Sequence, residues 1–177
     1  SEVLLDVKSA SNSATIDFTT GIGSSYDVYR CHYINVDPAN ATAVGFWARV
    51  TEDAGTTWKS GASDYSHAST GLTTTGTAAA NSSTGDANIT LQSSANAVAA
   101  AGTITGNLWL YHPSDTANSK KFVYENFYIQ GTTLVFCTTF GAGYYGGTTN
   151  AINGIRFMFT TGDITSGKFY LYGSKMS

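Results

Sequence analysis

Residues 154–173, GIRFMFTTGDITSGKFYLYG, decide the fold class of this chain, because their apolar side chains recur at every second position. Ile155, Phe157 and Phe159 form one such series before a glycine-containing turn, and residues 168–172 form another after it. A period of two is typical of a strand that buries one face. The segment therefore predicts two antiparallel strands joined by a turn.

The same pattern recurs along the rest of the chain. Alternating or apolar runs, each bounded by Gly, Asn, Asp, Ser or Pro, occupy residues 1–9, 14–20, 26–36, 43–52, 87–93, 102–113, 120–129 and 132–140. Residues 10–13, ASNS, resemble a turn between the first two runs. Together the runs predict an all-β protein with about nine or ten strands, arranged as an antiparallel sandwich or barrel.

The chain is expected to form a single domain over residues 1–177, because its composition shows no sharp break. The domain begins with the strands of residues 1–20. Residues 56–88 are rich in Ser, Thr, Gly and Ala and hold few large apolar residues, which predicts a long excursion on the surface. The alanine-rich residues 93–102 are compatible with one or two helical turns.

The amino-acid composition of the chain excludes some classes of binding partner. Charged residues make up only 12% of the chain, the net charge is −3, and Lys120-Lys121 is the only basic pair, so no nucleic-acid footprint is present. The sequence contains no apolar run of about 20 residues, so no transmembrane helix is predicted. Aromatic residues reach 13%, and eleven of them are tyrosines. A surface of this kind suits neutral partners such as sugars or other protein copies.

No motif in the sequence announces catalysis or a metal. The three histidines, His32, His67 and His112, are far apart, and none has a second histidine at the spacing typical of a zinc or catalytic motif. A G-x-S-x-G nucleophile motif is missing as well. We therefore expect a protein that is not an enzyme and that uses no catalytic residue, metal or cofactor.

The two cysteines, Cys31 and Cys137, each lie in an apolar, strand-like segment. Their spacing matches no metal motif. Two buried free thiols are the simpler interpretation. A disulfide stays open as an alternative, because it depends on whether the two strands are neighbours.

Residues 141–146, GAGYYG, fit the pattern G-x-G-x-x-G. The residues that follow, GTTN, are a poor helix start, whereas dinucleotide binding needs a helix N-terminus facing the pyrophosphate. We predict a glycine-rich turn instead. It would present Tyr144 and Tyr145 either as an exposed aromatic platform for a sugar ring or as a packing or inter-subunit contact.

Three further residues are candidates for ligand binding. Trp58 follows a turn and precedes the polar excursion, where it serves either as a cap over the core edge or as a ligand platform. Tyr65 and His67 lie inside the excursion, in SDYSHAS, where they could contact a ligand.

Three segments resemble a module of bacteriophage tail-fibre and other virion proteins. The first, residues 26–58, contains a long strand ended by an NVDP turn and a strand closed by DAGTTW. The second is GNLWLYHPSDTANSKKFVYENFY, residues 106–128. The third, residues 151–173, is similar to the terminal hairpin of the module and is the most specific. The likeness spans roughly residues 17–173.

The resemblance implies a jelly-roll-like β-sandwich on the exterior of a phage particle, working as an oligomer, usually a trimer, without catalytic residues. Its partners would be itself, other virion proteins and a host cell-surface glycan. Because little sequence precedes the matched region, a capsid decoration, cement or head-fibre protein bound to the capsid lattice is an alternative. A carbohydrate-binding domain or small glycosidase is a second alternative, supported by the aromatic content.

Oligomerisation has candidate residues of its own. Tyr170 and Tyr172 alternate with Phe169 and Leu171, so they are expected on the outward face of the last strand. Exposed apolar surface often marks a contact between proteins. These two tyrosines are the predicted oligomer interface.

Overall fold

The computed structural model describes residues 1–40, 44–93, 102–130 and 135–176. These residues form twelve strands and no helix, which confirms the all-β class. No described helix is therefore long and apolar enough to cross a membrane. The helical turns considered for residues 93–102 lie almost entirely outside the described residues.

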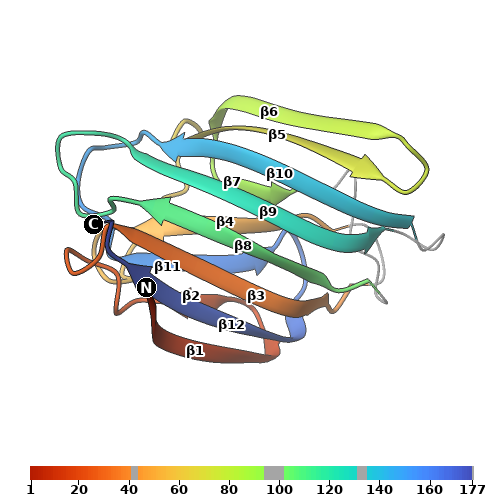
Figure 1. Ribbon diagram of the computed structural model, residues 1–177, viewed down its shortest axis with the longest axis horizontal. Coiled ribbons are helices and arrows are strands. Elements are labelled where there is room, and N and C mark those ends of the chain that lie inside the picture. Colours follow the sequence, from red (N-terminus) through yellow and green to blue (C-terminus); the bar gives the residue numbers. More distant parts are fainter. Residues whose placement is uncertain (41–43, 94–101, 131–134, 177) are drawn as a thin grey trace.

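The strands belong to two sheets, and all their pairings are antiparallel (Figure 1). The strands are β1 (Glu2–Ser13), β2 (Ile16–Phe18), β3 (Val28–Pro38), β4 (Phe46–Thr51), β5 (Tyr65–Thr73), β6 (Ala78–Asp86), β7 (Ile89–Gln92), β8 (Ile104–Tyr111), β9 (Lys120–Gln130), β10 (Val135–Tyr145), β11 (Gly154–Phe159) and β12 (Ile164–Ser174).

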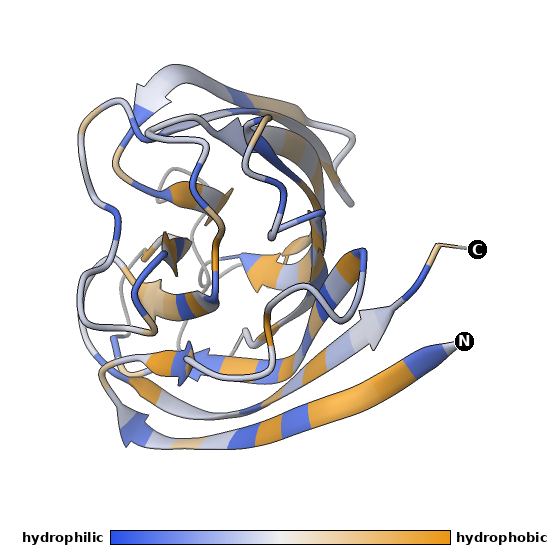
Figure 2. Ribbon diagram, turned by 90° about the vertical axis from the view of Figure 1, so that its left-hand side faces the viewer, coloured by the Kyte–Doolittle hydropathy of each residue, from blue (hydrophilic) through white to orange (hydrophobic). Residues whose placement is uncertain are grey.

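The larger sheet has eight strands in the order β1-β12-β3-β8-β9-β10-β5-β6, and the smaller has four in the order β2-β11-β4-β7. Figure 2 shows the two sheets as layers, with the larger one curving past the smaller. The apolar faces of both layers meet in one core. The predicted antiparallel sandwich is confirmed.

The two strands predicted from residues 154–173 exist, but they do not pair with each other. β11 pairs with β2 and β4 in the small sheet, whereas β12 pairs with β1 and β3 in the large sheet. Their apolar faces meet across the core, where the rings of Phe157 and Phe169 lie 5.4 Å apart. The predicted pairing was wrong because the same alternation fits two strands that face each other from different layers.

The centre of the core is a group of aromatic rings contributed by both sheets. The ring of Tyr33 lies 5.3 Å from Phe46, 5.6 Å from Phe157 and 6.1 Å from Phe169. All four side chains are fully buried. Burying a side chain of this size stabilises the fold by roughly 1.5–3 kcal/mol. These four rings therefore contribute directly to the contact between the two layers.

The Tyr33 hydroxyl, at the edge of this group, is buried together with a polar partner. It donates a hydrogen bond to Asn126 Oδ1, and Asn126 Nδ2 donates to the Leu91 carbonyl at 2.7 Å. Burial raises the pKa of Tyr33 well above its usual value. The amide of Asn126 thus links the large sheet to β7 in the small sheet without leaving these polar groups unpaired.

Two sequence boundaries differ from the prediction. Residues 10–13 continue β1 instead of forming a turn, and Ser11 and Ser13 pair with Ser166 and Ile164 of β12. Residues 56–88 contain β5 and β6, so paired strands make up most of the expected surface excursion. Small polar side chains can form strands there because the backbone of β5 pairs with β10 and that of β6 pairs with β5, and backbone hydrogen bonds need no large apolar residue.

Candidate interaction surface

The face of the large sheet that points away from the small sheet is named here the outer face. Residues directly opposite each other in an antiparallel ladder share a face. The register places Arg30, Trp109, Val123 and Ala142 side by side across β3, β8, β9 and β10. Within the described part of the chain, no further strand or helix lies over this face. It is the broadest surface that the fold leaves open to a partner.

Exposed apolar side chains gather on the outer face over β9, β10 and the adjoining end of β5. This group, the aromatic patch, consists of Leu72, Val123, Phe127, Phe136, Phe140 and Tyr144. Phe136 is 43% exposed, Phe140 is 49% exposed and Leu72 is 59% exposed. The Phe140 ring meets Phe127 edge-on at 6.2 Å. Large apolar side chains that stay in water side by side usually mark a contact surface.

The region of the outer face over β1, β12 and β3 holds a polar group that is paired within the chain, beside the exposed side chains of Leu4 and Val7. The Arg30 guanidinium lies 4.4 Å from the centre of the Tyr172 ring. Its Nε donates to Glu2 at 2.9 Å, and one terminal nitrogen donates to Asn107 Oδ1 at 2.8 Å. The hydrogen bonds with Glu2 raise the pKa of Arg30 and lower the pKa of Glu2. This arrangement ties the edge strand β1 to the middle of the sheet.

Both predicted interface tyrosines lie on the outer face, as their alternation with buried Phe169 and Leu171 indicated. The rings of Tyr170 and Tyr172 stack 6.4 Å apart, and His32 lies 6.1 Å from Tyr170. Their side chains are half-buried. The stack leaves ring surface available to a partner while Arg30 and His32 fix its position.

The glycine-rich turn predicted at residues 141–146 is wrong, because most of this stretch belongs to β10. A Cβ atom on Gly143 would lie 2.1 Å from the carbonyl oxygen of Ser66 and 2.6 Å from the Phe122 ring. A Cβ atom on Gly141 would lie 2.2 Å from the Tyr124 ring. The glycines make room for two aromatic rings that fold beneath the strand.

Tyr144 and Tyr145 point in opposite directions, because consecutive residues of a strand face opposite sides of the sheet. Tyr144 is 46% exposed on the outer face, whereas Tyr145 is 1% exposed in the core. The two rings therefore cannot form the shared platform predicted from the sequence. Tyr144 alone is open to a ligand.

Shallow hollows flank the Tyr144 ring. Ser119, Lys121, Ala142 and Gly143 line one hollow beside Tyr144. The other is lined by Ser66, His67, Ala68, Ser83, Ala142, Gly143 and Tyr144. An aromatic face next to hydroxyl and ammonium groups offers stacking and hydrogen bonds to the same neutral, hydroxyl-rich ligand.

Tyr65 and Tyr145, both predicted as ligand-binding residues, lie together in the core. Tyr65 is 0% exposed, and the two rings are 5.4 Å apart. The Tyr65 hydroxyl accepts a hydrogen bond from the Val50 amide at 2.9 Å and donates to the Lys59 carbonyl at 3.0 Å. With both ring and hydroxyl occupied, Tyr65 serves to pack β5 against the end of β4.

Glu52, which the sequence analysis did not identify, fastens two loops at one end of the molecule. Its carboxylate accepts hydrogen bonds from Tyr145 at 2.9 Å, from Asn150 at 3.2 Å and from the hydroxyl of Thr148, and it forms a 2.8 Å ion pair with Lys59. Burial by itself would raise the pKa of Glu52, but Lys59, Thr148, Tyr145 and Asn150 together lower it to about 2. The group therefore stays charged and acts as a structural clamp.

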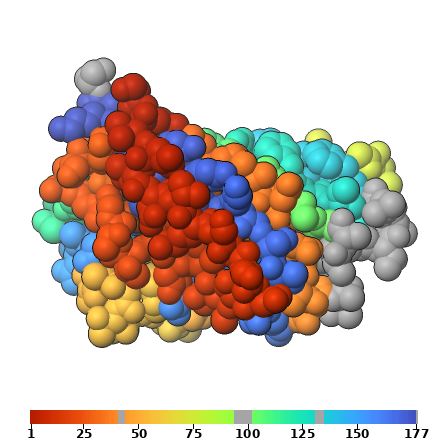
Figure 3. Space-filling model, turned by 90° about the horizontal axis from the view of Figure 1, so that it is seen from below, coloured from red at the N-terminus to blue at the C-terminus, as the bar shows by residue number. Residues whose placement is uncertain are grey.

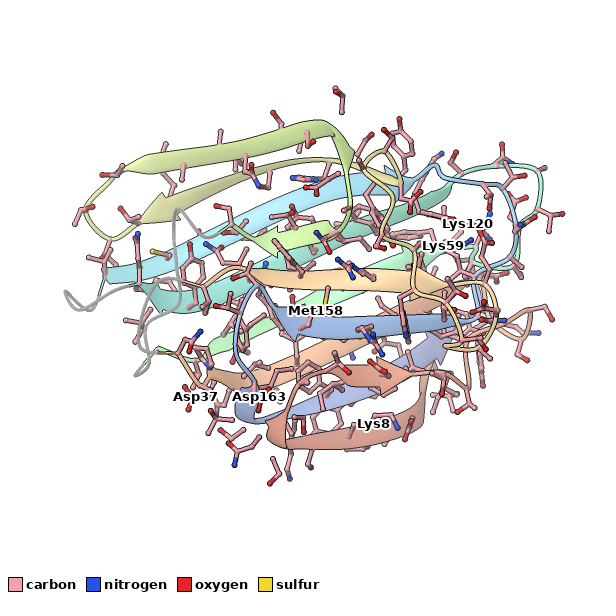
Figure 4. All side chains as sticks on the ribbon, turned by 180° about the vertical axis from the view of Figure 1, so that it is seen from behind. Lys8, Asp37, Lys59, Lys120, Met158 and Asp163 are labelled. Atoms are coloured by element: carbon pink, nitrogen blue, oxygen red, sulfur yellow. The ribbon has the colours of Figure 1, made fainter. Side chains whose placement is uncertain are left out.

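Lys120 is a second polar residue of structural importance at that end, and Figure 4 shows it near Lys59. It is 1% exposed, and its ammonium donates to the carbonyls of Asn118 at 2.8 Å and Thr149 at 2.9 Å. Burial lowers its pKa. In the sequence it was only one half of a basic pair, so its burial could not be foreseen.

Trp58 lies apart from the other predicted ligand residues, on the opposite side of the sandwich from the outer face. The Arg156 guanidinium lies 4.4 Å from the centre of its ring and forms a bidentate pair with Asp17, at 2.8 and 2.6 Å. Arg156 belongs to β11 of the small sheet. Trp58 thus covers an ion pair on the small sheet.

His67 is buried in β5 and is 5% exposed. Its Nε2 lies 3.3 Å from Asn81 Nδ2, and its Nδ1 lies 3.9 Å from Asp86. Burial lowers the pKa of His67, and the nearby Asp86 partly opposes this effect. The ring sits between β5 and β6 and therefore contributes to the hairpin more directly than to the hollow beside Tyr144.

Both cysteines are free and buried, which confirms the simpler interpretation of the sequence. Cys31 lies in β3 and Cys137 in β10, and β8 and β9 separate these strands. Burial raises the pKa of each thiol. Neither thiol is placed to react with a partner at the surface.

Most residues of the aromatic patch were not predicted from the sequence. A clue was available, because residues 120–129 and 132–140 carry large apolar side chains on both strand faces. Phe122 and Tyr124 fill the core, while Val123 and Phe127 point outward. A strand that is apolar on both faces needs a cover on each side, and the described residues supply a cover on only one side.

Comparison with known proteins adds no further assignment. Among the described residues, no group of three or more His, Cys, Asp or Glu side chains is placed to hold a metal ion. No family model, no curated protein and no solved structure matches this chain.

Proposed function

We propose that the protein is a non-catalytic surface protein of a bacteriophage virion, a homotrimeric tail-fibre-type module that contacts the host through its outer face. The proposal combines the resemblance of residues 17–173 to virion modules with one structural observation. That observation is the aromatic patch, in which Phe136, Phe140 and Tyr144 are each more than 40% exposed. An exposed apolar surface of this kind usually marks a site of contact with another molecule.

A jelly-roll assignment belongs to this proposal, and the strand orders support it. Without β5, β6, β9 and β10, the sheets have the orders β1-β12-β3-β8 and β2-β11-β4-β7. Strands β1 and β2, β3 and β4, β7 and β8, and β11 and β12 then lie in opposite sheets. An eight-stranded double sheet of this kind is typical of jelly rolls, which are common in viral capsid and lectin domains.

The outer face divides into two regions in this proposal. Tyr170 and Tyr172 on β12 contribute to the contact between subunits, and Tyr144 on β10 contacts a host glycan. Three strands lie between β12 and β10, which separates the two regions by about 19 Å at the usual strand spacing. Stacking on Tyr144 with hydrogen bonds to Ser119, Lys121 or Ser66 would recognise a sugar.

Two sets of variants test the two regions separately. Replacing Tyr170 and Tyr172 with Asp should reduce a trimer to monomers, as measured by light scattering, and leave the circular dichroism spectrum unchanged. Tyr144→Ala should abolish binding to a glycan array while the trimer persists. An unchanged mass in the first case, or glycan binding that survives Tyr144→Ala, would contradict the corresponding assignment.

A capsid decoration protein is the second candidate, and the composition of the aromatic patch favours it. Phe136, Phe140 and Leu72 offer no hydrogen-bonding group, which suits a protein lattice better than a sugar. Imaging of purified particles with a labelled protein separates the candidates. Label at the tail tip supports host contact, and label over the head supports decoration.

A further inference from the structure

The large sheet ends in two edge strands, β1 and β6, and the two edges are built differently. An edge strand presents a row of backbone N–H and C=O groups that no neighbour pairs. Such a row can accept a strand from another chain unless the protein blocks it with charges, prolines or bulges. The difference between the two edges therefore indicates which of them a partner can use.

The β1 edge carries the usual protection. Glu2, Asp6 and Lys8 place charges along the strand, and a bulge interrupts its register between Leu4 and Asp6. Figure 3 shows β1, in dark red, lying along the surface of the molecule seen from below. A strand that approached this edge would meet a kinked backbone and would have to desolvate charged side chains.

Over residues 78–83 the β6 edge has no such protection, although a bulge follows between Ser83 and Asp86, and Asp86 places a charge at the end of the strand. Residues 78–85, AAANSSTG, contain no charged residue and no proline. Their register with β5 is regular from Ala78 to Ser83. Their side chains are small, and none of them is buried. Figure 1 shows β6 at the outer margin of the large sheet, beyond β5.

The register of the hairpin shows which backbone groups of β6 point outward. The Thr73 amide donates to the Thr77 carbonyl at 3.1 Å, so these two residues form a hydrogen-bonded pair. Hydrogen-bonded and non-hydrogen-bonded pairs alternate in an antiparallel ladder. Ala78, Ala80 and Ser82 therefore occupy non-hydrogen-bonded positions opposite β5, and their N–H and C=O groups face away from the sheet.

We propose that β6 pairs with β6 of a second copy of this chain, antiparallel and around a two-fold axis near Ala80. In this register Ala80 faces its own counterpart, and Ala78 faces Ser82. All the outward backbone groups then find partners, and only small neutral side chains meet, so that no like charges approach. The contact is separate from Tyr170 and Tyr172 and does not depend on the virion role.

Ala80→Pro is the decisive variant. The N–H of Ala80 faces outward, so proline leaves the β5 ladder intact but removes a donor and blocks an incoming strand. Measured by native mass spectrometry and sedimentation velocity, the mass of the assembly should fall twofold, from dimer to monomer or from hexamer to trimer. Ala80→Ser, which keeps the N–H and stays neutral, should retain the wild-type mass.

Charge variants test the two-fold axis without proline. Ala80→Lys and Ala80→Asp should each weaken the pairing about fivefold, because each places like charges opposite each other. An equimolar mixture of the two should restore it. A wild-type protein that stays monomeric across a dilution series, or an assembly whose mass Ala80→Pro does not halve, would overturn the proposal.

Discussion

The two halves of the large sheet, β1-β12-β3-β8 and β9-β10-β5-β6, are stabilised in different ways. Strands of the first half face the small sheet and bury rings such as Tyr33 and Phe169. The second half ends in the hairpin of β5 and β6, where Tyr65 and His67 are the large buried side chains and β6 buries none. Side-chain packing fixes the first half, whereas backbone pairing carries most of the outer end of the second.

This difference between the two halves explains where a partner can bind. The first half buries its large rings against the small sheet and leaves Leu4 and Val7 of β1 exposed on its outer face. The other half keeps the aromatic patch on its outer face and an edge strand, β6, that carries no charge over residues 78–85. The molecule is thus a stable sandwich that carries an extension suited to intermolecular contacts.

The largest expected effect comes from making the same substitution in the core and on the exposed face of the second half. Phe157→Ala should lower the free energy of unfolding by about 3–5 kcal/mol, because it removes a ring from the aromatic core. Phe140→Ala, at an exposed position, should cost less than about 1 kcal/mol. Urea unfolding followed by tryptophan fluorescence measures both. Equal costs would show that the two regions do not differ in the way described.

A tight backbone contact gives the next effect, in the second half. Gly143→Ala should destabilise the protein by roughly 1–3 kcal/mol, because the new methyl group would press on the Ser66 carbonyl and the Phe122 ring. Gly23→Ala is the control, since no atom lies within 4 Å of the added group. Thermal unfolding distinguishes them, and a neutral Gly143→Ala would mean that β5 and β10 can separate at no cost.

Acid should loosen the clamp that joins the second half to the loops of the sandwich. Because the folded pKa of Glu52, about 2, is below its ordinary value, its contribution is complete above about pH 4.5. It is lost as the pH falls toward 2, and amounts to about 1–3 kcal/mol. In Glu52→Gln this component of the pH dependence of urea unfolding should disappear. A variant with the wild-type pH profile would assign the effect to other carboxylates.

The smallest effect concerns one hydrogen bond of the same clamp. Tyr145→Phe keeps the buried ring but removes the hydroxyl that donates to Glu52. We expect a loss of about 1 kcal/mol at neutral pH, since the carboxylate keeps its other donors. Differential scanning calorimetry can resolve this change. A loss as large as that of Phe157→Ala would indicate that the clamp, and not the core, limits stability.

Most strands could be predicted from the sequence, because the alternation of large apolar residues is a signal that a few neighbouring residues carry. This signal failed for β5 and β6, whose small polar residues form strands because β5 pairs with β10 and β6 pairs with β5. It also failed for Tyr144 and Tyr145, which two flanking glycines made resemble a turn. Gly141 and Gly143 are required by the Tyr124 and Phe122 rings, which belong to another strand.

Of the candidate surface, the sequence indicated Tyr144, Tyr170 and Tyr172 but not their neighbours. The structural roles of Glu52 and Lys120 could not be predicted from the sequence. Their partners Thr148, Asn150 and Thr149 come from a distant loop. Phe127 and Phe140 form a patch only because β9 and β10 pair in one register. Contacts between segments that are far apart in the sequence cannot be predicted from either segment alone.

The sequence alone determined that this chain is an all-β protein, because a period of two and the turn residues between strands are properties of a few neighbouring positions. Only the tertiary structure decided that the strands form a two-layer sandwich, that β11 and β12 belong to opposite layers, that Tyr145 is buried while Tyr144 is open, and that β6 lies at the edge of a sheet. These properties depend on which strands become neighbours, and strand pairing is chosen by the packing of the whole chain.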